Sequence, residues 1–192
     1  MNKWLATLKI KFNSSKYIAM KSSIISFLFL LFSTITSAQK MDNKSIDQRI
    51  AVIEDKMAIK YVVDEFSNLA DTKEIDKQVM LFTEDGVVQS VSNGQPSSTL
   101  KGREQLKQAF SGFLSNFHTI YHQNGQQTIN LQGNKAEAVS YCRVILVGKQ
   151  NDKEMKTTLY TIYKDLFVKE NGKWLISNRT SNFVRREVEE VK

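Results

Sequence analysis

Residues 154–180 read EMKTTLYTIYKDLFVKENGKWLISNRT, and this stretch decides the fold class. β-Branched and aromatic residues are frequent in both of its halves, and Asn171-Gly172 stands between them. An Asn-Gly pair between two such runs is the strongest short-range signal for a β-hairpin. The stretch therefore predicts two long antiparallel strands, Glu154–Lys169 and Lys173–Val188.

Two segments upstream have the same character. His118–Leu131 and Ala136–Gly148 are again rich in β-branched and aromatic residues. Compact polar turns, Gln132-Gly133-Asn134 and Lys149–Asp152, connect them to each other and to the next strand. The second half of the chain is thus predicted to be an antiparallel meander of four strands.

The first half of the chain has helical spacing instead. We expect helices over residues 44–70, 73–82 and 102–117, a strand near Val87–Val91 and a loop over Ser92–Ser98. Such an order predicts an α+β domain in which three N-terminal helices cover the apolar face of the sheet. The expected buried face of the first helix is formed by Ile46, Ile50, Ile53, Met57, Tyr61 and Leu69.

The N-terminus has the features of an export signal. Lys21 precedes a twelve-residue apolar run over residues 24–35, and the small residues Thr36-Ser37-Ala38 follow it. The run is shorter than the roughly 20 residues that a membrane span needs. We expect a signal peptide over residues 1–38, with either Met1 or Met20 as the true start, and a single mature domain over residues 39–192. The mature protein would be periplasmic or secreted without stable membrane insertion, and an uncleaved anchor is the alternative.

Charge and composition exclude several classes of partner. The formal net charge is +7, but five lysines and no acidic residue fall within residues 1–38, which leaves 22 basic against 20 acidic side chains. This balance does not favour nucleic-acid binding. One cysteine, Cys142, and two histidines exclude a disulfide framework, a multi-cysteine metal site and a histidine-rich metal centre. We expect no metal and no cofactor.

Local motifs in a particular order suggest a family. The first two motifs along the chain are Leu69-Ala70-Asp71 and Leu81-Phe82-Thr83-Glu84-Asp85-Gly86. The third is His122-Gln123-Asn124-Gly125-Gln126. The last two are Tyr163-Lys164-Asp165 and Gly172-Lys173-Trp174, followed by Arg179. Over roughly residues 45–187 the chain resembles the SnoaL-like branch of the nuclear transport factor 2-like superfamily. The resemblance implies a curved, mainly antiparallel sheet wrapped against helices, a cone with an internal pocket, and a homodimer.

The resemblance also implies a pair of site residues. His122 resembles a catalytic histidine of the scytalone dehydratase branch, and Asp71 matches the catalytic aspartate of that branch. A carboxylate facing an imidazole orients the ring and raises its basicity. The alternatives are a hydrogen-bonded core histidine and a helix cap. The second histidine and the two tyrosines of that branch fall near Val147, Ala70 and Ser90, so they are absent here.

Further side chains are candidates for the lining of the pocket. We expect the ligand-binding residues Tyr61, Phe66, Phe82, Gln126 and Tyr163, and a ligand that is a small hydrophobic or aromatic molecule. Alternatively, the aromatic residues fill the core. Asp165 and Arg179 are expected to form a cross-strand ion pair, with a structural role unless the pocket reaches them.

Three functions stay open on the sequence. The missing polar pocket residues favour an exported small-molecule-binding domain without catalysis. Asp71 and His122 keep a second hypothesis, a cofactor-independent enzyme of the isomerase, dehydratase or hydrolase type. The third is a non-catalytic, dimerising interaction domain.

Overall fold

The computed structural model describes residues 45–92 and 94–191. The predicted leader over residues 1–38 lies outside them. The chain divides into two compact units, Met1–Ile50 and Ala51–Lys192, and the second carries the whole sheet described below. No helix among the described residues is long and apolar enough to cross a membrane.

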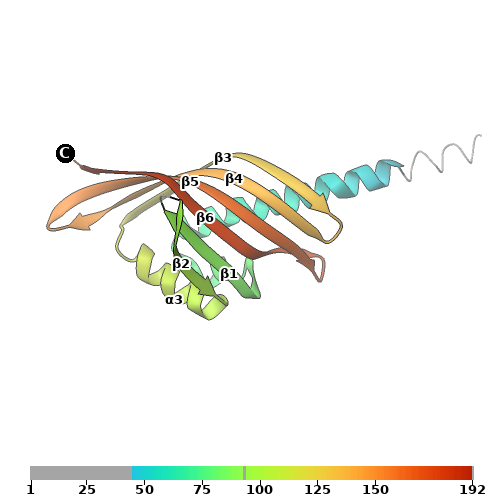
Figure 1. Cartoon of the computed structure of the whole chain (residues 1–192), viewed down its shortest axis with the longest axis horizontal. Helices are drawn as coiled ribbons and strands as arrows, with labels where there is room; N and C mark the ends of the chain where they lie inside the picture. The colour runs from blue at the N-terminus through green and yellow to red at the C-terminus, as the bar shows by residue number, and fades with distance from the viewer. Residues whose placement is uncertain (1–44, 93, 192) are drawn as a thin grey trace, which may run out of the picture. The chain divides into compact units, whose positions relative to one another are not determined.

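A six-stranded sheet dominates the second unit, and the predicted α+β architecture with a curved sheet is confirmed (Figure 1). The strand order is β2-β1-β6-β5-β4-β3, and every neighbouring pair is antiparallel except β1 and β6, which run parallel. Residues 45–71 are helical, and α3 packs beside β1 and β2. The other elements are α2 (Ile75–Val79), β1 (Phe82–Ser92), β2 (Gln95–Lys101), α3 (Arg103–Leu114), β3 (Thr119–Gln132), β4 (Lys135–Gln150), β5 (Lys153–Glu170) and β6 (Lys173–Glu190).

The four predicted strands of the meander are all present, but the loop predicted over Ser92–Ser98 is wrong. Most of it belongs to β2, which pairs antiparallel with β1 at the edge of the sheet. Gly94 has φ +75°, a backbone conformation that glycine adopts without strain, and it turns the chain between the two strands. The side chains of β2 are almost all exposed and polar, so the sequence lacks the apolar alternation that identifies a strand.

A β-bulge in β3 determines which side chains face the interior. The register between β3 and β4 shifts between Asn124 and Gln127. Every second side chain is shielded up to Asn124, and after the bulge the alternation resumes at Gln127. Gly125, a residue that often marks such an irregularity, lies within the shift. The bulge lets the polar residue His122 and the apolar end of the same strand share the inner face.

The first helix packs through a different face from the one predicted. Tyr61 is 62% exposed and Met57 is 67% exposed, and Leu69 alone of the expected set is buried. The helix is apolar on opposite faces, so spacing alone does not show which face the sheet covers. The side chains that enter the core are Ile59, Val62, Val63, Phe66, Leu69 and Ala70.

Asp55 ties this helix to the last hairpin of the sheet. Its Oδ1 accepts hydrogen bonds from Trp174 Nε1 at 2.8 Å and Lys169 Nζ at 2.6 Å. The hydrogen bond from Lys169 lowers the pKa of Asp55, and burial opposes this only in part. The ionised carboxylate therefore holds two elements that are far apart in the sequence.

Replacing Asp55 with alanine should lower the free energy of unfolding by about 1–2 kcal/mol at pH 7, because Trp174 and Lys169 lose their acceptor. The pKa of Asp55 is lower in the folded than in the unfolded chain, so its contribution is complete above the unfolded value of 3.8 and is lost as the pH falls through the folded value. Urea unfolding at pH 7 and pH 3 measures the difference. Glu54→Ala, which removes the exposed neighbouring carboxylate, is the control. An equal effect of Asp55→Ala at both pH values would contradict the argument.

Candidate functional site

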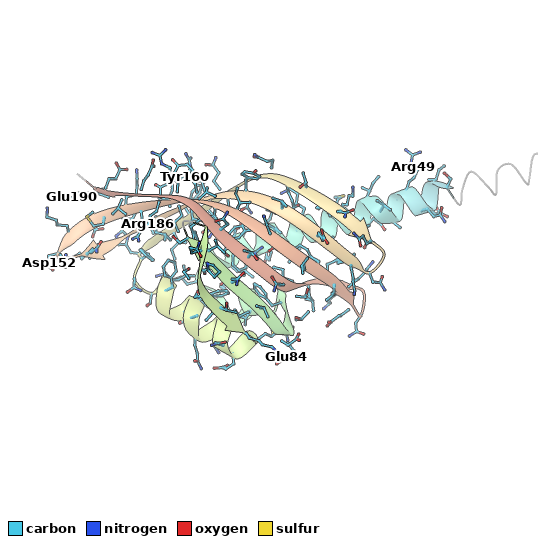
Figure 2. The ribbon with its side chains drawn as sticks, viewed as in Figure 1. Arg49, Glu84, Asp152, Tyr160, Arg186 and Glu190 are labelled. Carbon is cyan, nitrogen blue, oxygen red and sulfur yellow. The ribbon has the colours of Figure 1, made fainter. Side chains whose placement is uncertain are left out.

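A cavity of about 300 Å³ lies between the sheet and the helices. Side chains from the first helix, α2, α3 and every strand of the sheet line it, and most of them are apolar. The charged residues labelled in Figure 2, such as Glu84, Asp152 and Glu190, project from the periphery instead. Six of the residues lining the cavity are Phe66, Val88, Phe110, Leu146, Leu159 and Tyr163.

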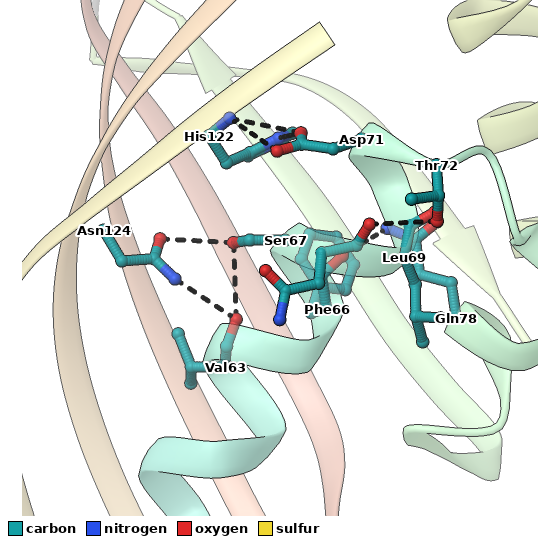
Figure 3. A network of polar contacts seen from close by, with 10 residues as sticks. Val63, Phe66, Ser67, Leu69, Asp71, Thr72, Gln78, His122 and Asn124 are labelled. Carbon is teal, nitrogen blue, oxygen red and sulfur yellow. Dashed lines mark hydrogen bonds and ion pairs between the residues drawn. The ribbon is translucent and has the colours of Figure 1, made fainter.

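Asp71 and His122 form a close pair at this cavity (Figure 3). Asp71 Oδ1 lies 2.6 Å from His122 Nδ1, and the backbone N–H of His122 donates to both carboxylate oxygens at 3.1 Å. The imidazole is 6% exposed and the carboxylate 24%. The alternative in which Asp71 caps the next helix is wrong, because α2 begins without a side-chain cap and the carboxylate is bound to His122.

The pair fixes the protonation pattern of the imidazole. A carboxylate only accepts hydrogen bonds, so the short contact places the proton of the neutral ring on Nδ1. Nε2 then carries the lone pair and makes no hydrogen bond to any residue that the structure describes. His122 lines the cavity, so it can act there as a general base.

A small polar network holds the first helix against β3 near this pair (Figure 3). Ser67 Oγ donates to Asn124 Oδ1 at 3.2 Å, and Asn124 Nδ2 donates to Asp64 Oδ1 at 3.1 Å. Asn124 lies two residues after His122, and Ser67 lies one helical turn before Asp71. The network therefore fixes both halves of the pair relative to each other.

Arg179 also lines the cavity. Its Nε and Nη2 donate to the two oxygens of Asp165, each at 2.8 Å, and the side chains are 1% and 0% exposed. The predicted ion pair is confirmed, and the cavity reaches Arg179. The guanidinium lies 4.1 Å from the ring centre of Phe66 and 4.4 Å from that of Tyr163. Burial lowers the pKa of Arg179, but the charge and hydrogen bonds of Asp165 raise it more, so it stays charged.

A second bulge turns Arg179 inward. The register between β5 and β6 shifts where Leu166 pairs with Asn178 and Phe167 with Ile176, which leaves Ser177 as an extra residue. Regular alternation from the buried Ile176 would have placed Arg179 on the outer face. The extra residue makes the side chains after Ser177 point to the opposite face of the sheet from the one that regular alternation predicts. Arg179 is therefore buried on the inner face, where it contacts Asp165.

Two further reactive side chains near the cavity are inert. Burial raises the pKa of Tyr163 well above its usual range, so its hydroxyl stays protonated and can only donate or accept a hydrogen bond. Burial also raises the pKa of the Cys142 thiol to about 12, so the nucleophilic thiolate does not form at neutral pH. Among the described residues, no group of three or more potential ligands could hold a metal ion.

The expected pocket residues divide into two groups. Phe66, Tyr163 and His122 line the cavity. The lining does not include Tyr61, Phe82 and Gln126, so the expectation that these three residues line the pocket is wrong. Tyr61 lies on the outer face of its helix; Phe82 is fully buried in the core, edge-on to Phe66; and Gln126 is exposed in the β3 bulge.

Sequence reasoning missed Gln78 as a cavity residue, although a signal was present. Gln78 follows Ile75 by three residues and precedes Val79, and these three are the buried side chains of α2. A lone polar residue on the apolar face of a short helix marks a place where a buried amide needs partners. Gln78 Nε2 donates to the backbone oxygen of Phe66 at 3.0 Å.

A family model for the SnoaL-like domain matches residues 51–180. The chain belongs to the SnoaL-like family. The match covers most of the residues that line the cavity, together with the Asp71–His122 pair and the Asp165–Arg179 pair. The comparison with curated proteins gave no match.

Several solved structures share the fold. A protein from Novosphingobium aromaticivorans that carries the provisional name scytalone dehydratase is 22% identical, with a TM-score of 0.62 over 73% of this chain and 91% of its own. A hexachlorocyclohexane dehydrochlorinase is 12% identical, with a TM-score of 0.60 over 73% of this chain and 90% of its own. A protein with a cystatin-like fold from Novosphingobium aromaticivorans is 19% identical, with a TM-score of 0.57 over 72% and 87% of the two chains. At these identities the likeness concerns the fold.

Proposed function

We propose that this SnoaL-like protein is a small cofactor-independent enzyme that moves a proton on a mainly apolar organic molecule. His122 is the base and Asp71 is its positioning residue. The observation that carries the proposal is the 2.6 Å contact at Nδ1, which leaves Nε2 of a cavity-lining histidine without a hydrogen-bond partner among the described residues. With the leader predicted over residues 1–38, the activity would belong to the periplasm or the exterior of the cell.

The chemistry follows from the protonation pattern. Nε2 removes a proton from a C–H, N–H or O–H group of the bound molecule, and Asp71 stabilises the imidazolium that forms. Returning that proton to another atom gives an isomerisation, and giving it to a departing group gives an elimination. The imidazole is 6% exposed and most of the cavity walls are apolar, so the electrostatic interaction within the pair is stronger than it would be in water.

The family and its structural neighbours support this reaction class. Two similar structures are named as a dehydratase and a dehydrochlorinase, names that denote loss of water and of hydrogen chloride. The second histidine and the tyrosines of the scytalone dehydratase branch are absent here, so the proposed mechanism uses one imidazole for both proton steps. The alternative function, ligand binding without catalysis, would use the same cavity. The experiment below distinguishes it from the proposed enzyme.

Proton exchange tests the proposal without knowledge of the natural substrate. Indanone is a compact, uncharged molecule whose protons next to the carbonyl are weakly acidic. In D₂O with EDTA, the mature domain should replace these protons with deuterium faster than the same buffer without protein, as measured by loss of the proton NMR signal. Binding of indanone without accelerated exchange would contradict catalysis and favour the binding domain. Absence of both would favour the interaction domain.

A further inference from the structure

Two buried polar atoms at the cavity have no partner among the residues that the structure describes. They are Nη1 of Arg179 and Oε1 of Gln78. Both side chains are 1% exposed, and both residues line the cavity. The remaining polar atoms of each side chain are used, because Nε and Nη2 of Arg179 bind Asp165 and Nε2 of Gln78 binds the backbone oxygen of Phe66.

The directions of these two atoms are determined by their neighbours. The backbone oxygen of Phe66 only accepts, so the amide of Gln78 must present its nitrogen there and keep its oxygen free. Asp165 holds the guanidinium by two parallel hydrogen bonds, and Phe66 and Tyr163 lie against its faces. Residues that line the cavity thus hold a donor, Arg179 Nη1, and an acceptor, Gln78 Oε1, in fixed orientations, in addition to Nε2 of His122.

Buried polar groups in folded proteins are nearly always paired, so two free ones at one cavity need an explanation. Within residues 45–92 and 94–191, two other buried side-chain atoms lack a partner, Gln127 Oε1 and Thr161 Oγ1, and their residues do not line this cavity. Of the atoms that lack a partner in the described part of the chain, those of Arg179 and Gln78 are the two whose residues line the cavity.

We propose that Arg179 and Gln78 form a recognition subsite for an uncharged polar group of the ligand. Nη1 donates to a carbonyl oxygen, and Oε1 accepts from a hydroxyl or N–H group. Asp165 already balances the charge of Arg179, and Gln78 Oε1 would repel an anion, so a carboxylate is disfavoured. The substrate class is a compact, mainly apolar carbonyl compound with one hydroxyl or N–H donor. This inference rests on the proposed function, since it names the substrate class for the same cavity.

Four matched probes test the subsite by binding alone. They are indane, indanone, hydroxyindanone and indane carboxylate, titrated into the mature domain by calorimetry or NMR. We expect indanone to bind about tenfold more tightly than indane, a difference of about 1.4 kcal/mol. Hydroxyindanone with its hydroxyl toward Gln78 should bind more tightly still, and indane carboxylate less tightly than indanone.

Variants assign each preference to its residue. Asp165→Leu combined with Arg179→Met removes both charges together, and it should bring the indanone-to-indane ratio close to one while indane still binds. Gln78→Met should abolish only the advantage of hydroxyindanone over indanone. Gln127→Met is the matched control, because it changes a buried amide with a free oxygen outside the cavity, and it should preserve both ratios.

Several outcomes would overturn the inference. Equal binding of indane and indanone would show that bound water satisfies these atoms and that the ligand does not use them. Tightest binding of indane carboxylate, or no binding of any probe at millimolar concentration, would also refute it. The binding ratios are measured independently of proton exchange. If the ratios are as expected but the protein does not accelerate exchange, the proposed function is refuted and the subsite is not. If the protein accelerates exchange but binds indane and indanone equally, the subsite is refuted and the proposed function is not.

Discussion

Replacing His122 with alanine should reduce the catalysed exchange of indanone protons to the rate of the buffer. General-base catalysis by one side chain contributes about 10²–10⁴-fold, and this imidazole is the base of the proposed mechanism. The NMR exchange experiment measures the loss directly. The cavity keeps its apolar walls in the variant, so indanone should still bind.

The fold should tolerate this change. Asp71 accepts two hydrogen bonds from the backbone N–H of residue 122, and these do not depend on the side chain. The carboxylate therefore keeps a partner, and the free energy of unfolding should fall by only about 1 kcal/mol. His122→Gln offers an amide that can donate to Asp71 but is not basic, so it should be as inactive as alanine. A loss of activity that followed only from unfolding would appear as a lower melting temperature.

Asp71→Asn tests the positioning role. The new amide nitrogen can donate to Nδ1, which shifts the ring proton to Nε2 and removes the basic lone pair from the cavity. We expect exchange to fall by at least tenfold while indanone binding changes little. His118→Ala is the control, because it removes the other histidine, a surface residue paired with Glu154. Retention of more than a tenth of the activity by His122→Ala, or an equal loss in His118→Ala, would contradict the assignment.

The meander was predictable because its signals are local. Asn171-Gly172 specifies a hairpin by backbone conformation, and Gly172 indeed has φ +78°. Gly125 stands between a polar and an apolar half of one strand, which is typical of the bulge that β3 contains. The approach of Asp71 to His122 was expected from the family resemblance, since the two residues are 51 positions apart and no local pattern connects them.

The remaining errors arise where tertiary packing decides. β2 is a polar edge strand, so its sequence resembles a loop until β1 provides hydrogen bonds. Tyr61 lies on an apolar face that the sheet does not cover, and only packing distinguishes that face from the one with Ile59. Arg179 points inward because of one extra residue in β6, which strand alternation does not reveal.

Breaking the Asp165–Arg179 pair should cause the largest loss of stability among these variants. Removing one partner of a buried ion pair leaves an uncompensated charge and costs about 3–5 kcal/mol. The two side chains are 1% and 0% exposed, so the charge that remains stays largely desolvated. Asp165→Leu should be worse than Arg179→Met, because an orphaned carboxyl can take up a proton whereas a guanidinium cannot release one. Urea unfolding at pH 7, followed by circular dichroism, measures both.

Removing both charges should restore most of this stability. Buried ion pairs replaced by apolar residues of similar volume are often neutral or stabilising, so Asp165→Leu with Arg179→Met should unfold within about 1 kcal/mol of the original protein. If a single variant fails to fold, the unfolding free energy of the double variant still tests the argument. Single variants that each cost less than 1 kcal/mol would contradict the argument. If the fold loses the pair without cost, stability does not account for it, and the proposed recognition of a ligand by Arg179 does.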